Sequence, residues 1–157
     1  MSEKILIVDD DQTIRLVLTE ALKKRGFELE EAGSAEEALD KIMVTCPPRP
    51  GAGQVAIKTG EGRPAPFDLV ITDVRLPKMS GLEAVSRIRE LDPQAIVIVV
   101  TAHGGKEIAL EAIRKGAYDY FTKPFKLKEM EIVIERALEK RRLQNELMLL
   151  REKIKKN

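Results

Sequence analysis

The stretch FDLVITDVRLPKMSGLEA, residues 67–84, decides the fold class, because an apolar run passes directly into an aspartate and then into a helix. Residues 69–71 have the continuous apolar character of a strand that is buried on both faces. Asp73 ends this strand, and a proline and a glycine mark the turn toward a helix that starts near Ser80. An aspartate in that place is a helix cap, a metal ligand or a nucleophile, and the rest of the chain must decide among these roles.

The same alternation of apolar strands and amphipathic helices extends outward in both directions. We predict five strands, at residues 5–8, 27–32, 67–72, 95–100 and 118–122, each followed by a helix. Ser34 and Glu37 form a predicted capping box at one helix, and the last helix begins near Lys126. Three strands are apolar throughout, which predicts an α/β fold with a doubly wound, five-stranded parallel sheet covered by five helices on both faces.

Polar residues of complementary chemistry follow four of the five predicted strands. They are Asp9, Asp10 and Asp11 after the first, Asp73 after the third, Thr101 after the fourth, and Lys123 with Pro124 after the fifth. In open parallel sheets, ligands bind beyond the carboxyl ends of the strands, where the strand order reverses. We therefore expect these side chains on one rim of the sheet.

Such a set of carboxylates predicts a Mg²⁺ site, because repulsion among acids is relieved by a hard cation. Asp10 and Asp73 are the expected direct ligands, Asp9 is a direct or water-mediated ligand, and the backbone carbonyl of Arg75 supplies a third protein oxygen. Asp73 is then the expected phosphoryl acceptor. Lys123 and Thr101 would pair with oxygens of the transferred group.

Four ordered motifs carry a resemblance to a known family: IVDDD (7–11), ITDVRLPKMSGLE (71–83), VVTA (99–102) and YFTKPF (120–125). The chain resembles the CheY-like receiver domains of two-component response regulators from residue 4 to about 137, apart from residues 44–67. The resemblance implies a sheet of order 2-1-3-4-5, Mg²⁺ dependence, a sensor histidine kinase as phosphodonor and a cis bond between Lys123 and Pro124.

The resemblance also implies a conformational switch in which Thr101 moves toward the phosphoryl group and Tyr120 rotates inward behind it. We further hypothesise that Arg75 and His103 tune the lifetime of the acyl phosphate by shielding or positioning the attacking water. For His103, simple exposure on the surface is an equal alternative.

Residues 44–67 interrupt the receiver-like pattern, and they hold five of the eight prolines and four of the ten glycines. The segment enters the third strand at its amino-terminal end, so we expect it on the side opposite the carboxylates. Its GAG and GEG sequences lack a dinucleotide fingerprint and a phosphate-loop lysine. A short strand or hairpin over residues 54–59 and an excursion without chemistry are the remaining interpretations.

The last helix is expected to extend well beyond a receiver domain that spans residues 1–137. Its first half, with Met130, Val133, Ile134 and Ala137, should pack on the sheet. Residues 138–157 form a predicted linker in which Leu143, Leu147, Leu150 and Ile154 follow heptad spacing. We expect a coiled-coil homodimer, with a frayed monomeric helix as the alternative. The linker resembles those that lead to effector domains in transcriptional activators, so an effector domain or a downstream protein is the expected partner.

Composition limits the other functions. The 27 basic and 26 acidic residues nearly cancel, and residues 139–157 hold seven basic against three acidic residues. We read this basic excess as a solvated face, because no base-reading module accompanies it, and we expect no membrane span. The single cysteine, Cys46, and the absence of a signal peptide predict a cytoplasmic protein.

Two other functions compete with the signalling switch. A metal-dependent phosphohydrolase with an aspartyl nucleophile usually needs a second aspartate two residues further on, where this chain has Arg75. A dimerisation module without phosphorylation would not need the acidic set together with Thr101 and Lys123. We therefore expect no enzymatic activity other than phosphorylation and dephosphorylation of the chain itself.

Overall fold

The computed structural model describes residues 3–45, 67–76, 78–102 and 105–156. Most of the predicted insertion, including Cys46 and residues 54–59, for which a short strand or hairpin is one interpretation, lies outside the described residues, as does His103. Within the described ranges, strands and helices alternate as the sequence predicts. The elements are β1 (Lys4–Val8), α1 (Gln12–Lys23), β2 (Glu28–Ala32), α2 (Ala35–Thr45), β3 (Leu69–Asp73), α4 (Gly81–Leu91), β4 (Val97–Thr101), α5 (Lys106–Arg114), β5 (Asp119–Thr122) and α6 (Leu127–Lys156).

The five strands form one parallel sheet in the order β2-β1-β3-β4-β5, which confirms the predicted fold class and strand order. The order reverses between β1 and β3, where Val8 pairs with Thr72. The next residues along these two strands are Asp9 and Asp73, so the register itself brings the two aspartates side by side. The two aspartates therefore lie at the topological switch point of the sheet, where the strand order reverses.

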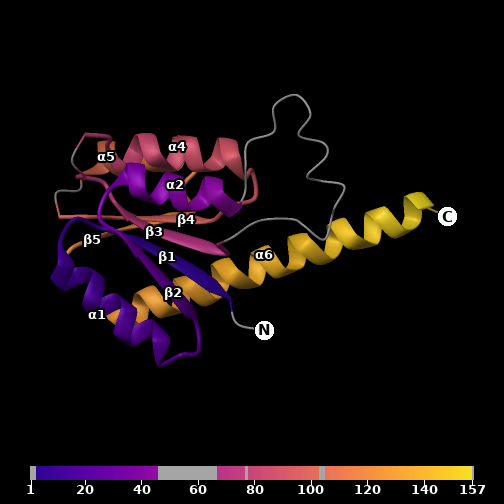
Figure 1. The fold of residues 1–157 in the computed structure, drawn as a ribbon, viewed down its shortest axis with the longest axis horizontal. Helices are drawn as coiled ribbons and strands as arrows, with labels where there is room; N and C mark the ends of the chain where they lie inside the picture. The colour runs from indigo at the N-terminus through magenta and orange to yellow at the C-terminus, as the bar shows by residue number, and fades with distance from the viewer. Residues whose placement is uncertain (1–2, 46–66, 77, 103–104, 157) are drawn as a thin grey trace.

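Helices cover both faces of the sheet (Figure 1). On one face α2, α4 and α5 bury apolar side chains such as Ile42, Val85 and Ala112 against the strands. On the other face α1 and α6 do so with Leu22 and Ile134. Because both faces are covered, β3 and β4 are buried at every position, as their apolar sequences predict.

Side chains at the helix starts fix where the strands give way to helices. Ser80 caps α4, since its Oγ accepts a hydrogen bond from Glu83 N at 3.2 Å. Ser34 Oγ likewise accepts from Glu37 N at 3.1 Å. The carboxylate of Glu37, however, accepts from Gly33 N at 2.9 Å, one residue earlier than in the predicted capping box.

The last helix, α6, has 30 residues and runs across the sheet before it continues beyond the domain (Figure 1). Met130, Ile134, Ala137 and Leu138 are buried against the sheet, while Leu143, Leu147, Leu150 and Ile154 are exposed. The expected division between a packed half and a half with an exposed apolar stripe is therefore present. No helix in the described ranges has both the length and the apolar character to span a membrane.

Candidate functional site

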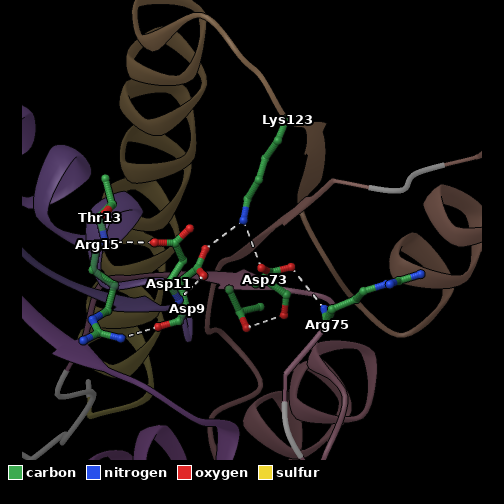
Figure 2. Close-up of polar contacts among 8 residues, drawn as sticks. Asp9, Asp11, Thr13, Arg15, Asp73, Arg75 and Lys123 are labelled. Atoms are coloured by element: carbon green, nitrogen blue, oxygen red, sulfur yellow. Dashed lines mark hydrogen bonds and ion pairs between the residues drawn. The ribbon is translucent and has the colours of Figure 1, made fainter.

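The carboxyl ends of β1 and β3 bring three acids together, as the sequence predicts. Asp9, Asp10 and Asp73 each offer a carboxylate oxygen, and these oxygens all lie within 4.8 Å of one another. Asp9 and Asp73 are buried and Asp10 is exposed. Figure 2 shows Asp9 and Asp73 on neighbouring strands, with Lys123 between and above them.

Lys123, which follows β5, connects the two buried acids. Its Nζ lies 3.0 Å from Asp9 Oδ2 and 3.0 Å from Asp73 Oδ2 (Figure 2). Burial by itself would lower the pKa of Lys123, but the hydrogen bonds and charges of Asp73 and Asp9 together outweigh it, so the pKa is raised. The ammonium is therefore held in its charged form.

The positive charge of Lys123 does not completely compensate the negative charge of the acidic cluster. Burial raises the pKa of Asp9, and the nearby charge of Asp73 raises it further. Hydrogen bonds from the Asp11 amide and from Lys123 oppose this rise without cancelling it. The site therefore still favours additional positive charge, and its exposed Asp10 carboxylate gives it an open side. A cluster of hard oxygen donors of this kind fits Mg²⁺.

The backbone after Asp73 fits tightly around the carboxylate. Arg75 N donates to Asp73 Oδ1 at 3.0 Å, and Gly81 N donates to Val74 O at 2.8 Å. A Cβ on Gly81 would lie 1.9 Å from the carbonyl oxygen of Asp73, far inside van der Waals contact. Only glycine lets α4 begin so close to the end of β3.

The structure separates three neighbouring acids that look alike in the sequence. Asp9 accepts from Asp11 N at 2.9 Å and pairs with Lys123, whereas Asp11 caps α1 by accepting from Thr13 N at 2.9 Å (Figure 2). Asp11 is therefore a helix cap. Asp9 and Asp10 remain the acids of the cluster, as the sequence predicts.

Thr101 and Tyr120 lie on the two strands beyond β3. Thr101 is buried at the end of β4, and its carbonyl accepts from Lys123 N at 2.8 Å, which ties β4 to the lysine. Tyr120 on β5 is 37% exposed. The Lys123–Pro124 peptide bond is cis, as the resemblance implies.

Arg75, for which we hypothesise a role in the lifetime of the acyl phosphate, follows Asp73 by two residues. Its backbone amide contacts Asp73, but its side chain is exposed and directed away from the three acids (Figure 2). In this structure the guanidinium therefore does not reach back into the acidic pocket.

Sequence reasoning did not identify Arg15, one helical turn after the Asp11 cap. Its Nη1 donates to the backbone carbonyl of Asp9, and its Nε lies 3.1 Å from Glu31 Oε1. Arg15 thereby holds the turn between β1 and α1 against β2. The only sequence signal is an arginine four residues after a capping aspartate, a spacing that is common in ordinary helices.

Comparisons with known proteins agree with this geometry. A family model described as the response regulator receiver domain matches residues 51–135. The chain is 33% identical over 144 residues to the regulatory protein AtoC of Escherichia coli, covering 92% of this chain and 27% of AtoC. The first three curated relatives are all longer regulators, of which the chain spans about a quarter (24–28%).

Two further similarities extend over nearly the whole of the compared protein. The chain is 33% identical to the sporulation initiation phosphotransferase F of Bacillus subtilis, covering 88% of this chain and 95% of that protein. It also superposes on a solution structure of the beryllofluoride-activated NtrC4 receiver domain dimer. That superposition has a TM-score of 0.71 and 29% identity, and it covers 88% of this chain and 98% of that chain.

Proposed function

Since this chain belongs to the response regulator receiver domain family, we propose that Asp73 accepts a phosphoryl group from a sensor histidine kinase in an Mg²⁺-dependent reaction. The arrangement of Asp9, Asp73 and Lys123 carries this proposal. Two buried carboxylates share one ammonium at 3.0 Å each, beside a third, exposed carboxylate. Such a site favours a second cation and tolerates the charge that a phosphoryl group adds.

In the proposed reaction, a carboxylate oxygen of Asp73 attacks the phosphorus of a phosphohistidine. A new oxygen–phosphorus bond forms, the nitrogen–phosphorus bond breaks, and the imidazole of the kinase leaves with the electron pair of that bond. Lys123, whose raised pKa keeps it charged, pairs with an oxygen of the transferred group. Thr101 donates its hydroxyl to another.

Asp10, Asp73, the carbonyl of Arg75, and Asp9 directly or through water would hold the Mg²⁺. The cation would supply charge neutralisation for the carboxylates and the phosphoryl oxygens. The chain's own contribution is to keep these ligands in place. Asp9 is held by the amide of Asp11 and by Arg15, and Asp73 is held by the amide of Arg75.

The proposed response to phosphorylation involves Thr101 and Tyr120. Movement of Thr101 toward the new phosphoryl group would leave space at the end of β4, and Tyr120 would rotate inward from its present exposed position. Thr101 and Tyr120 would thus form an element with two states, and the charge of the phosphoryl group would shift the equilibrium between them. We propose that its output is control of an effector domain or a downstream protein, most simply in transcription.

We further propose that the chain forms a homodimer through the exposed stripe of α6, which consists of Leu143, Leu147, Leu150 and Ile154. Four large apolar side chains at heptad spacing on one helix are typical of a coiled-coil seam. The similarity to a receiver domain dimer supports this interpretation. The domain boundary at residue 137 and the cytoplasmic location remain predictions.

Intact mass spectrometry after incubation with acetyl phosphate and Mg²⁺ tests the proposal. The parent should gain one phosphoryl group, and Asp73→Asn should gain none. Asp11→Asn is the matched control, because asparagine also caps helices and Asp11 lies outside the acidic cluster. Omission of Mg²⁺ should slow the reaction strongly.

The same experiment separates the proposal from its alternatives. An adduct on Asp73→Asn equal to that on the parent would refute the assignment of the acceptor. Sustained turnover of a generic phosphoester by the parent would favour the phosphohydrolase. Dimerisation without any adduct on the parent would favour the module that works without phosphorylation.

A further inference from the structure

Arg141, in the middle of α6, carries a charge that is almost completely buried, with 4% of the residue exposed. Its Nη2 donates to Asp92 Oδ2 at 3.3 Å, its Nη1 donates to the carbonyl of Gln94, and its Nε lies 3.5 Å from Asp68 Oδ1. The basic excess of residues 139–157 predicts a solvated face, and this prediction is wrong for Arg141. Burying a guanidinium is unfavourable unless several groups compensate it, so these contacts indicate a specific role.

The position of Arg141 on the helix connects it to the core. Arg141 follows Ala137 by four residues and Leu138 by three, so it lies on the same face as these buried side chains. Among the described side chains of α6, Arg141 is the last buried one. At 100° per residue, Leu143 lies about 200° around the helix from Arg141, so the exposed stripe and the buried guanidinium lie on different sides of the helix.

The partners of Arg141 are themselves anchored at the amino-terminal edge of the sheet. Asp68 directly precedes β3, and its Oδ2 accepts from Lys4 N at 2.9 Å. The amide of Asp92 donates to Ile88 O at 2.8 Å at the end of α4, and Asp92 Oδ1 accepts from Gln94 N at 3.1 Å. The guanidinium therefore binds Asp68, which is held by β1 and precedes β3, and the turn that follows α4.

We infer that Arg141 is a positioning residue that fixes the direction in which the distal part of α6, residues 143–154, leaves the domain. None of the described side chains of the distal part is buried. Short isolated helices are only marginally stable, so the distal part depends on its attachment to the packed part. Among the described side chains of α6, Arg141 is the final attachment inside the protein, and it fixes the direction of the exposed stripe.

The adjacent Arg142 provides a control with the same charge. Arg142 pairs with Glu3 at 2.6 and 2.9 Å, and its side chain is 47% exposed. Exposed ion pairs contribute little, because water and salt compete for both partners. Loss of Arg142 should therefore leave the direction of the helix nearly unchanged, whereas loss of Arg141 should not.

Double electron–electron resonance spectroscopy, which measures the distance between two spin labels, tests the inference. Labels are attached to Glu20→Cys on α1 and Glu152→Cys on α6, both exposed, in a Cys46→Ser background, and the chain is diluted with excess unlabelled chain. The parent and Arg142→Met should give the same narrow distance distribution. Arg141→Met should give a distribution at least twice as wide or shifted; an unchanged narrow distribution would overturn the inference.

Milder variants keep the test decisive if Arg141→Met unfolds the whole domain. Asp68→Asn and Asp92→Asn each remove the charge of one partner and keep an acceptor in place. Far-UV circular dichroism should show them folded, and their distance distributions should be wider than that of the parent. Narrow, unshifted distributions for both would refute the role of Arg141. The measurement uses no phosphate donor, so its outcome is independent of whether Asp73 is phosphorylated.

Discussion

Replacement of Gly81 with alanine should destabilise the domain and displace the proposed phosphoacceptor. Gly81 is the first residue of α4, and an added Cβ would lie 1.9 Å from the carbonyl oxygen of Asp73 and 2.9 Å from Val74 Cα. Both contacts are with backbone atoms, so rotation of a side chain cannot relieve them. The start of α4 or the end of β3 must move.

The size of the effect follows from this distance. To reach even 3.0 Å, the methyl group and the carbonyl oxygen must separate by about 1.1 Å. Overpacking of this kind costs about 1–3 kcal/mol, and the better helix propensity of alanine returns at most about 1 kcal/mol. We expect a net loss of about 1–2 kcal/mol in the free energy of unfolding. A displacement of about 1 Å at Asp73 should slow phosphorylation by up to about 100-fold.

Urea unfolding followed by far-UV circular dichroism measures the stability, and intact mass spectrometry with acetyl phosphate measures the phosphorylation rate. Gly105→Ala is the control, because Gly105 is the N-cap of α5, has φ of −124°, and an added Cβ there would have no atom of the described residues within 4 Å. The free energy of unfolding of Gly105→Ala should fall by no more than about 1 kcal/mol, the usual effect of alanine at a helix cap. Its phosphorylation rate should equal that of the parent. The reasoning fails if Gly81→Ala matches Gly105→Ala in both measurements.

Two further predictions concern α6 and the lysine of the site. Ile134→Ala should reduce the free energy of unfolding by about 2–5 kcal/mol, because the side chain is fully buried. Ile132 is 56% exposed, so Ile132→Ala should change the free energy of unfolding by less than about 0.5 kcal/mol. Equal losses of the two variants in urea unfolding would contradict the orientation of the helix. Because the pKa of Lys123 is raised above 10.5, its stabilising contribution should be complete below pH 10.5 and should disappear as the pH rises through the raised pKa. The stability difference between the parent and Lys123→Met should therefore shrink in alkaline urea titrations, and a difference that grows with pH would refute this sign.

The sequence predicts the site well because its position follows from the topology of the sheet. Apolar strands of this length, alternating with helices, allow a parallel sheet, and in such a sheet residues that follow the strands must meet at one rim. Asp9, Asp73 and Lys123 are separated widely along the chain, yet each directly follows or ends a strand. To predict the position of the site, it is therefore enough to know where the strands end, and the ends of the apolar runs indicate this clearly.

The details that the sequence does not predict depend on the direction in which each side chain leaves its helix. Lys140, Arg141 and Arg142 are neighbours with the same charge, but Lys140 lies 5.4 Å from the centroid of the Tyr118 ring, Arg141 is buried and Arg142 pairs with Glu3. Each step along the helix turns the side chain by about 100°, so the three meet different surroundings. Two partners of Arg141, Gln94 and Asp92, lie 47 and 49 residues earlier in the chain, and Asp68 lies earlier still, so all three are beyond the reach of local patterns.

The length of α6 beyond its last buried side chain turns it into a lever arm. From Arg141 to Ile154 the helix rises about 20 Å, at 1.5 Å per residue. A tilt of about 10° at the edge of the sheet would therefore sweep the tip through about 3–4 Å, roughly the spacing between two or three residues along a neighbouring helix. Motions too small to disturb the core can thus become changes of alignment at the far end of the molecule.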